Sequence, residues 1–276
     1  MATTTTITSP HAWSPDVTGF LPGDVVPDAI ILAASTIAGT VEGDEPAVRI
    51  PFVADDGDAG FVAEGAEIPD TDPDLDETVV LTGKVAKLSR FSREQLEQPN
   101  AAKLIVDSMS RSVTRKGNRA FLANPAGGPG PVGLLNAGIT EIVTPIEANL
   151  DLITEAIAMI ETADGTATQI IASPAAWADL SRLKKSTDSN ESLLGAGTET
   201  VERRLESLPV LVTNAMPAGQ LLVLDKSTVL SAVGDVKLAR SEHAYFSSDS
   251  IGVRVTWRAG WKVQRPGRVV KLTIGA

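Results

Sequence analysis

Alternating apolar and polar positions near the start of the chain predict a two-stranded ribbon. Val48, Ile50 and Phe52 of "VRIPFV" fall on one face of a strand. Pro51 indicates an edge strand, because proline donates no backbone hydrogen bond. The expected antiparallel partner is "ETVVLTGKVAKLS", so the acidic segment between the two would form the tip of the ribbon. The apolar segment before the ribbon, "DAIILAASTIAGTVEG", is ambiguous between a short helix and a strand.

A helical period follows between Asn100 and Leu122. Ser92 is a candidate N-cap, and Pro99 would reset the start of the helix. The apolar positions form a narrow stripe of Ile105, Met109, Val113, Ala120 and Phe121, and the polar positions around it are Asp107, Arg111, Arg115 and Asn118. A helix of about 20 residues spans about 30 Å. So narrow a stripe predicts a helix that lies across a surface rather than inside a core.

From about residue 144 the pattern changes to alternating helix and strand. Asn149 is expected to cap one helix, and Ser173 followed by Pro174 predicts the N-cap and first residue of a second. Their inward faces would be Leu150, Ile153, Ile157 and Ile160 in the first helix, and Trp177, Leu180 and Leu183 in the second. "TQIIA", "LPVLVTN", "QLLVLD" and nearly everything from "VKLARSE" to "RVVKLTIG" predict strands, while "KKSTDSNESLLGAGTET" predicts a polar loop.

Composition narrows the class of protein. The 276 residues carry a net charge of −11 and 4% aromatic residues, which argues against general nucleic-acid binding, since that needs cations and stacking platforms. The chain has no cysteine, so it has no disulfide and no thiolate metal site. No run of about 20 apolar residues could span a bilayer, and the N-terminus lacks the features of a signal peptide. We therefore expect a soluble, intracellular protein.

The segment "ADDGDAGFVAEGAEIPDTDPDLDE" holds ten acidic residues and no basic one. These are Asp55, Asp56, Asp58, Glu64, Glu67, Asp70, Asp72, Asp74, Asp76 and Glu77. Aligned as a calcium-binding loop from Asp70, the segment has Leu75 where the sixth position needs glycine and Leu81 where the twelfth needs glutamate. Such a loop could neither turn nor close around the ion. We favour an arm that is solvated or that docks on a basic surface.

Two further motif matches are better explained by chance or by structure. "GGPGPVG" has the G-x-G-x-x-G spacing of a dinucleotide site, but it follows a helix and contains two prolines, so we interpret it as a stiff turn that closes the long helix. Ser181 and Lys184 match S-x-x-K without a companion K-T-G. The only histidines, His11 and His243, belong to no metal or catalytic motif. We expect no catalytic residues and no enzyme activity.

Four segments, taken in order, carry a resemblance: "FLANPAGGPGPVGLLN", "ASPAAWADLSRLKKSTDSNESLLG", "LPVLVTNAMPAGQLLVLD" and "GVRVTWRAGWKVQRPGRVVKLTIG". Preceded by an N-terminal arm, an acidic ribbon and a long helix, they closely resemble the major capsid proteins of tailed bacteriophages, which share the Hong Kong 97 fold. The resemblance covers nearly the whole chain. Each segment is a weak signal alone, but their order is specific.

The resemblance implies an α+β fold that is divided along the chain. The expected parts are an N-arm at 1–27, an extended E-loop ribbon at 48–88, a discontinuous peripheral domain with a long spine helix at 28–47, 89–143 and 236–265, and an axial α/β domain at 144–235 and 266–276.

The resemblance also implies a structural role. Members of this family self-assemble as hexamers and pentamers into an icosahedral shell that encloses double-stranded phage DNA without sequence-specific binding. They carry no cofactor or metal and involve no membrane. The expected location is the capsid of the virion, assembled in the host bacterial cytoplasm, with a portal and, in some members, a decoration protein as partners. Because only a short arm precedes the ribbon, we expect scaffolding to come from a separate protein.

An isolated two-stranded ribbon is marginal in water, and crowded like charges destabilise it further. We therefore expect the ten acidic residues to contact the shell wall of a neighbouring subunit. The candidate receiving surface comprises the basic residues Arg111, Arg115, Lys116, Arg119, Arg254, Arg258, Lys262, Arg265 and Arg268.

Two alternatives stay open, and one family reaction is not expected. An encapsulin-type cellular nanocompartment shares the fold and a similar length, although "GPVGLLN" and "MPAGQLLVLD" favour a phage shell. An acidic metal-dependent or nucleotide enzyme would require a stabilising effect of calcium or of a dinucleotide. Some capsid proteins join an E-loop lysine to a neighbour's asparagine, but no lysine or arginine occurs from Ile50 through Gly83, and the last asparagine is Asn214. We therefore expect noncovalent contacts.

Overall fold

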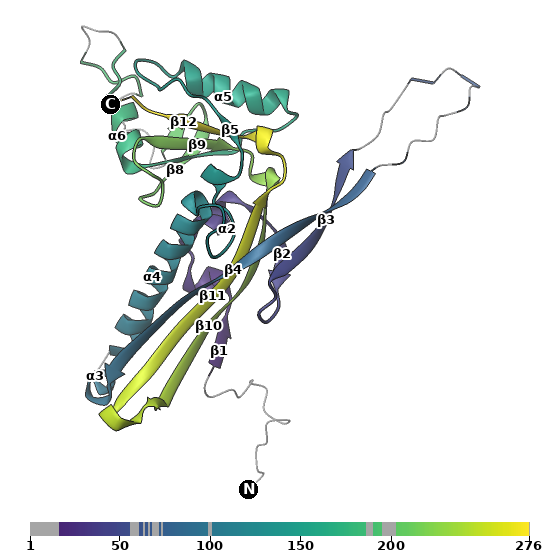
Figure 1. Cartoon of the computed structure of the whole chain (residues 1–276). Helices are drawn as coiled ribbons and strands as arrows, with labels where there is room; N and C mark the ends of the chain where they lie inside the picture. Colours follow the sequence, from purple (N-terminus) through teal and green to yellow (C-terminus); the bar gives the residue numbers. More distant parts are fainter. Residues whose placement is uncertain are drawn as a thin grey trace.

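The computed structural model describes residues 17–55, 61–62, 64–65, 67, 72, 74–98, 101–185, 190–194 and 203–275. It has a flat, elongated part with a long helix, a smaller α/β part at one end, and a ribbon that projects from the side (Figure 1). The helices are α1 (Pro22–Val25), α2 (Ile30–Ala34), α3 (Arg93–Glu97), α4 (Ala101–Ala123), α5 (Asp151–Thr162) and α6 (Pro174–Arg182), with short 3-10 turns at Leu134–Asn136, Lys226–Thr228, Phe246–Ser248 and Pro266–Arg268. The strands are β1 (Val17–Phe20), β2 (Thr36–Val41), β3 (Ala47–Asp55), β4 (Asp74–Ser92), β5 (Thr140–Glu141), β6 (Gln169–Ala172), β7 (Arg204–Leu205), β8 (Leu208–Val212), β9 (Gln220–Leu224), β10 (Val229–Tyr245), β11 (Ser250–Val263) and β12 (Val269–Thr273).

The flat part is built on a six-stranded sheet, the long sheet, in the order β1-β10-β11-β4-β3, with β2 pairing beside β10. Odd-numbered residues of β11, from Ile251 to Val263, are buried, whereas Arg254 and Lys262 on the alternate positions are exposed. This period of two places one face of the sheet against a core and leaves the other open.

Helix α4 covers the buried face of the long sheet. Met109, Val113 and Phe121, at 1% exposure or less, point toward it, as the narrow apolar stripe predicts. The approach is close, because a Cβ on Gly117 would lie 2.6 Å from Cζ3 of the buried Trp257. The prediction of a helix lying across a surface is confirmed.

The smaller part is a second six-stranded sheet, the compact sheet, in the order β5-β12-β9-β6-β8-β7. Both of its faces are buried. Leu221 and Val223 pack into one core cluster together with α5 and α6, and Leu222 and Leu224 pack into the cluster that also holds the end of α4. The core cluster of the long sheet therefore extends to one face of the compact sheet, and a separate cluster covers the other face.

The turn after α4 joins these parts. Trp261 donates a hydrogen bond from Nε1 to the Val132 carbonyl at 2.7 Å, and its ring meets Phe121 edge to face at 5.4 Å. Gly130 has a φ of +100°, a conformation that glycine adopts without strain. The interpretation of "GGPGPVG" as a structural turn is confirmed.

Local predictions mostly hold, with one correction. Ser173 accepts a hydrogen bond from the Ala176 amide and caps α6, and the segment before the ribbon forms both a helix, α2, and a strand, β2. Ser92 caps the short helix α3 rather than α4. The prediction that Asn149 caps α5 is wrong: the N-cap residue is Leu150, and Asn149 donates to the Asp151 carboxylate instead. The helix starts one residue later than the capping pattern suggests, and the asparagine bonds a side chain in its first turn.

Candidate intersubunit surfaces

The ribbon consists of β3 and residues Asp74–Leu81 of β4, paired antiparallel from Ala47 opposite Leu81 to Asp55 opposite Asp74. From Thr82 onward, β4 changes partner and pairs with β11 in the long sheet. One 19-residue strand therefore carries the ribbon and anchors it in the body of the molecule. In Figure 1 the ribbon continues from the edge of the long sheet and projects away from the body of the molecule.

The two faces of the ribbon differ. One face is buried at its base, where Ile50 and Val80 join a small core cluster with β2 and β10. The other face exposes apolar side chains to solvent in the part of the chain that the structure describes: Leu75 is 75% exposed and Leu81 62%, and Val53 and Val79 are also exposed. Paired registers of Val53 with Leu75, and of Ala47 with Leu81, put these residues on one side.

The acidic residues of the paired strands are divided between the two faces: Glu77 lies on this apolar face, whereas Asp74 and Asp76 lie on the opposite face. Asp74, Asp76 and Glu77 are exposed on β4, and Glu64, Glu67 and Asp72 are exposed beyond the paired region. Arg49 neutralises one of them by an ion pair with Glu77 at 2.8 Å, an exposed contact that contributes little to stability. Asp55 ends β3, while Asp56, Asp58 and Asp70 lie outside the described residues.

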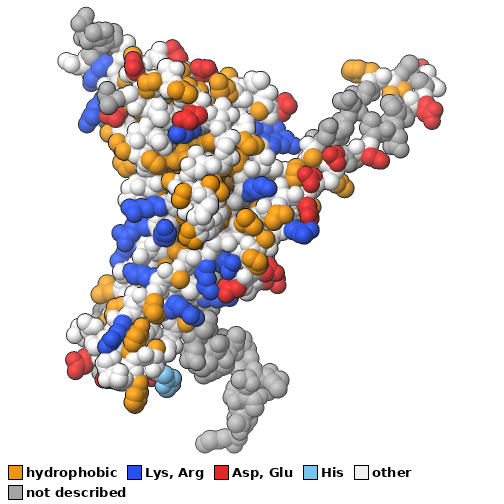
Figure 2. All heavy atoms as spheres, in the orientation of Figure 1, with side chains coloured by type: hydrophobic (Ala, Val, Ile, Leu, Met, Phe, Trp, Pro, Cys, Tyr) orange, Lys and Arg blue, Asp and Glu red, His pale blue; other side chains and the backbone are white. Residues whose placement is uncertain are grey.

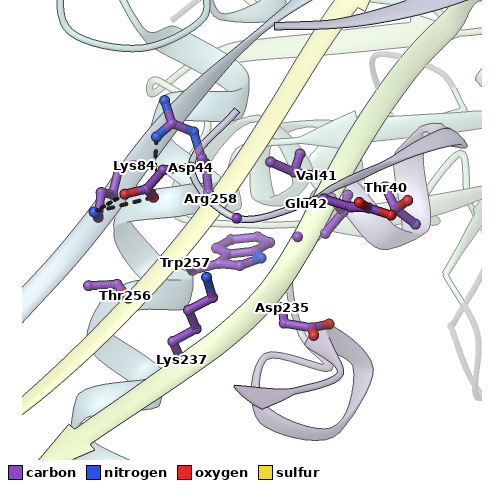
Figure 3. A pocket seen from close by; sticks show the side chains of 13 residues that line it. Thr40, Val41, Glu42, Asp44, Lys84, Asp235, Lys237, Thr256, Trp257 and Arg258 are labelled. Atoms are coloured by element: carbon purple, nitrogen blue, oxygen red, sulfur yellow. Dashed lines mark hydrogen bonds and ion pairs between the residues drawn. The ribbon is translucent and has the colours of Figure 1, made fainter. Parts of the chain in front are cut away.

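A clamp fixes the base of the ribbon (Figure 3). Asp44, in the turn between β2 and β3, lies 3.1 Å from Lys84 Nζ on β4 and 3.5 Å from Arg258 Nη1 on β11. Arg258 also donates from Nε to the Thr82 hydroxyl at 2.8 Å, where β4 changes partner. The hydrogen bond from Lys84, together with its charge, lowers the pKa of Asp44. These contacts tie the turn and both strands together and set the direction in which the ribbon leaves.

The clamp occupies part of the candidate receiving surface. Arg258 is committed to Asp44 and Thr82 within its own chain. Arg268 donates to the Ala163 carbonyl at 2.8 Å and lies 3.8 Å from Asp225, so it links the start of β12 to the end of α5. Both arginines already stabilise the subunit that carries them.

Arg265 is exposed at the N-cap of the 3-10 turn Pro266–Arg268, and the other six candidate cations fall on opposite sides of the molecule. Arg254 and Lys262 project from the open face of the long sheet, because they alternate with residues that face α4. The four on α4 are exposed, and they are Arg111, Arg115, Lys116 and Arg119. By the helical period the three arginines lie away from the stripe that faces the sheet, and Lys116 lies beside it. A neighbour's ribbon docked on one side of the molecule could therefore contact the cations of the open sheet face or those of α4, but not both groups. The structure therefore separates residues that sequence reasoning placed together.

Comparison with known proteins identifies the family. The model of the phage capsid family matches residues 33–274. The chain belongs to the phage capsid family. A solved structure from Gordonia phage Cozz is similar at a TM-score of 0.71 with 16% identity, over 90% of this chain and 87% of that one. One from Mycobacterium phage Adephagia has a TM-score of 0.68 with 13% identity, over 90% of each chain.

A third solved structure, the capsid of a native GTA particle, covers 100% of each chain at a TM-score of 0.67 and 13% identity. No curated protein sequence matches the chain. At these low identities the likeness shows the fold. This bacteriophage capsid protein therefore has the expected α+β, Hong Kong 97-like fold, and its role is structural.

Two further observations concern the described part of this capsid protein. No helix there is long and apolar enough to cross a membrane. No three acidic or histidine side chains among the same residues converge to hold a metal ion. The acidic segment is only partly described, so this second observation covers the paired strands of the ribbon and not its whole tip.

Sequence reasoning missed the apolar face of the ribbon. The density of carboxylates drew attention away from Leu75, Val79 and Leu81, which alternate along β4 on one face. The sequence shows this alternation, but it does not show whether this face of β4 or the opposite face, with Thr78 and Val80, is exposed. Only the pairing with β3 and the packing of Val80 under β2 decide which face is free.

Proposed function

We propose that this capsid protein is the repeating subunit of a closed icosahedral shell, arranged as hexamers and pentamers around double-stranded phage DNA. The ribbon is the E-loop of each subunit and lies on the wall of a neighbour. One observation carries the proposal: a long ribbon, clamped at its base, presents a row of exposed apolar side chains that no described residue of its own chain covers. Burial of such a row against a second copy is favourable by about 25 cal/mol per Å² of apolar surface.

The contact is noncovalent and combines apolar burial with charge attraction. Glu77 lies within the apolar row, and Asp74 and Asp76 lie on the other face of the same strand. Arg254 and Lys262 project unburied from the open face of the long sheet. Opposite charges at the rim orient two copies and exclude wrong alignments, while the apolar row supplies most of the free energy. The open sheet face is thus the receiving surface that this proposal favours.

The remaining parts of the proposal follow the expected division of the chain into N-arm, peripheral domain, ribbon and axial domain. The shell is assembled in the host cytoplasm, with a separate scaffolding protein and a portal, and becomes the capsid of the virion. A decoration protein can bind the finished shell.

Electron microscopy of the purified protein tests the proposal. We expect negative-stain images to show large hollow particles. A second sample lacks residues 55–77, with a short Gly-Ser link in their place, and should contain folded protein without particles, because all buried residues of the three core clusters lie outside that range. Particles of normal size from the shortened protein would contradict the role of the ribbon, and absence of particles from the intact protein under all assembly conditions would contradict the shell.

A further inference from the structure

Helix α4 carries an unusual concentration of positive charge for a chain with a net charge of −11. Over Ala101–Ala123 it has five basic residues and one acidic residue, Asp107, whereas α5 has three acidic residues and no basic one. Charge is therefore sorted between elements rather than spread evenly. Figure 2 shows blue side chains gathered along the flank of the molecule where α4 runs in Figure 1.

Four of these cations form what we call the cationic row: Arg111, Arg115, Lys116 and Arg119. At 100° per residue, Arg111, Arg115 and Arg119 lie about 180°, 140° and 100° from the mid-line of the apolar stripe of Met109 and Val113, whereas Lys116 lies at the edge of that stripe, about 40° from its mid-line. All four are exposed. Among the described residues, none of the four has an ion pair or hydrogen bond from its side chain, in contrast to the clamped Arg258 and Arg268.

The spacing of the row matches a linear polyanion. Arg111, Arg115 and Arg119 follow one another at intervals of four residues, which is about 6 Å along the helix axis. The whole helix, at 23 residues, is about 35 Å long, close to one turn of duplex DNA. A straight helix that presents cations on its outer side can therefore lie along the phosphates of a duplex without reading its bases.

We propose that the cationic row binds the phosphate backbone of double-stranded DNA without sequence preference, so that the α4 face of each subunit is the face turned toward the enclosed genome. DNA as the occupant rests on the shell proposed above. The open face of the long sheet, on the other side of the molecule, stays available to the ribbon of a neighbour. The α4 face thus contacts DNA, and the open face of the long sheet contacts the ribbon of a neighbouring subunit.

The net negative charge limits the strength of this contact. At about 0.1 M salt, charges more than about 10 Å apart are largely screened, so acidic residues elsewhere oppose the approach of DNA but weaken a formed contact little. Four phosphate contacts correspond to a slope of about −3.6 in a plot of log K against log salt concentration. Such binding is weak and reversible, which suits a container that DNA must enter and leave.

Binding of a fluorescent 20-base-pair duplex to unassembled protein, measured by anisotropy over a range of salt concentrations, tests the proposal. The variant R111Q/R115Q/R119Q should lose most of the affinity, and its salt slope should shrink by about 3. Lys237 of β10 is paired with Thr256 and shares the sheet face of Arg254. The matched variant K237Q/R254Q/K262Q therefore removes the same charge from the open sheet face and should bind as the intact protein does. Equal loss in both variants, or no salt-dependent binding by the intact protein, would overturn the proposal.

Two further measurements distinguish the contact between DNA and the cationic row from the contacts between subunits. A synthetic peptide of residues 54–77 should not compete with the duplex for the row. If the peptide binds intact protein but not the R111Q/R115Q/R119Q variant, and DNA binds neither, the row receives the ribbon instead. Closed particles should not bind added duplex, and binding through the row by intact particles would place α4 on the outside. If microscopy shows particles but the unassembled subunits do not bind DNA, this inference is refuted and the proposal of a shell is unaffected.

Discussion

Gly117 marks the closest approach of α4 to the long sheet, and a single methyl group there tests the packing of the two layers. A Cβ would lie 2.6 Å from Cζ3 of Trp257, which is 2% exposed. Alanine favours a helix over glycine by about 1 kcal/mol, but overpacking a closed core costs about 1–3 kcal/mol. We expect Gly117→Ala to destabilise unassembled protein by up to about 2 kcal/mol in chemical denaturation, since the clash outweighs the propensity.

The background substitution Trp257→Leu provides the control, because it removes the ring that the new methyl group meets. In that background Gly117→Ala should be neutral or stabilising, as helix propensity alone predicts. The same loss of stability in both backgrounds would mean that the packing of α4 on Trp257 is not the cause.

At the scale of elements, substitutions in the ribbon should affect the assembly of subunits without changing the stability of the single subunit. Leu75 and Leu81 are exposed in the single chain, so their replacement removes little from the folded subunit. We expect Leu75→Ser/Leu81→Ser to leave the thermal midpoint of unassembled protein within about 2 °C and to reduce the yield of sedimenting particles at least tenfold, because the apolar row would lose its burial against a neighbour.

Val143→Ser is the comparison for this variant, since Val143 is 83% exposed on the segment that follows β5, away from the ribbon. It should assemble normally. If both variants assemble as the intact protein does, the apolar face of the ribbon is not an intersubunit contact, and the acidic residues of the ribbon alone would have to hold it.

At the scale of the whole molecule, the shell should be free of covalent links. Lysine-to-asparagine linkage between subunits needs a lysine far out on the ribbon, and none occurs from Ile50 through Gly83. Lys84, the next lysine, lies at the base of the ribbon and is held by Asp44. Mature particles boiled in detergent should therefore give one band near 28.8 kDa on a denaturing gel, and a ladder of multimers would show that another pair of residues reacts.

The sequence by itself determined the local elements and the family. The stripe from Met109 to Phe121 predicts α4, the alternation around Ile50 predicts an edge strand, and Ser173 before Pro174 predicts the start of α6, because these signals depend on neighbours within a few residues. The order of short motifs was enough to indicate a capsid protein. The one local prediction that failed, the cap at Asn149, failed by a single residue.

Only the tertiary structure decided which faces are free. The sequence shows that Arg254 alternates with apolar residues and that Arg115 lies on a helix, but not that the two point to opposite sides of one sheet. Nor does it show that β4 changes partner at Thr82, or that Asp44 holds Lys84 and Arg258 there. The physical reason is that period and propensity are local, whereas the pairing of strands and the burial of a face depend on residues up to about 200 positions away, such as Ser35 and Ser231, which bond each other under β2.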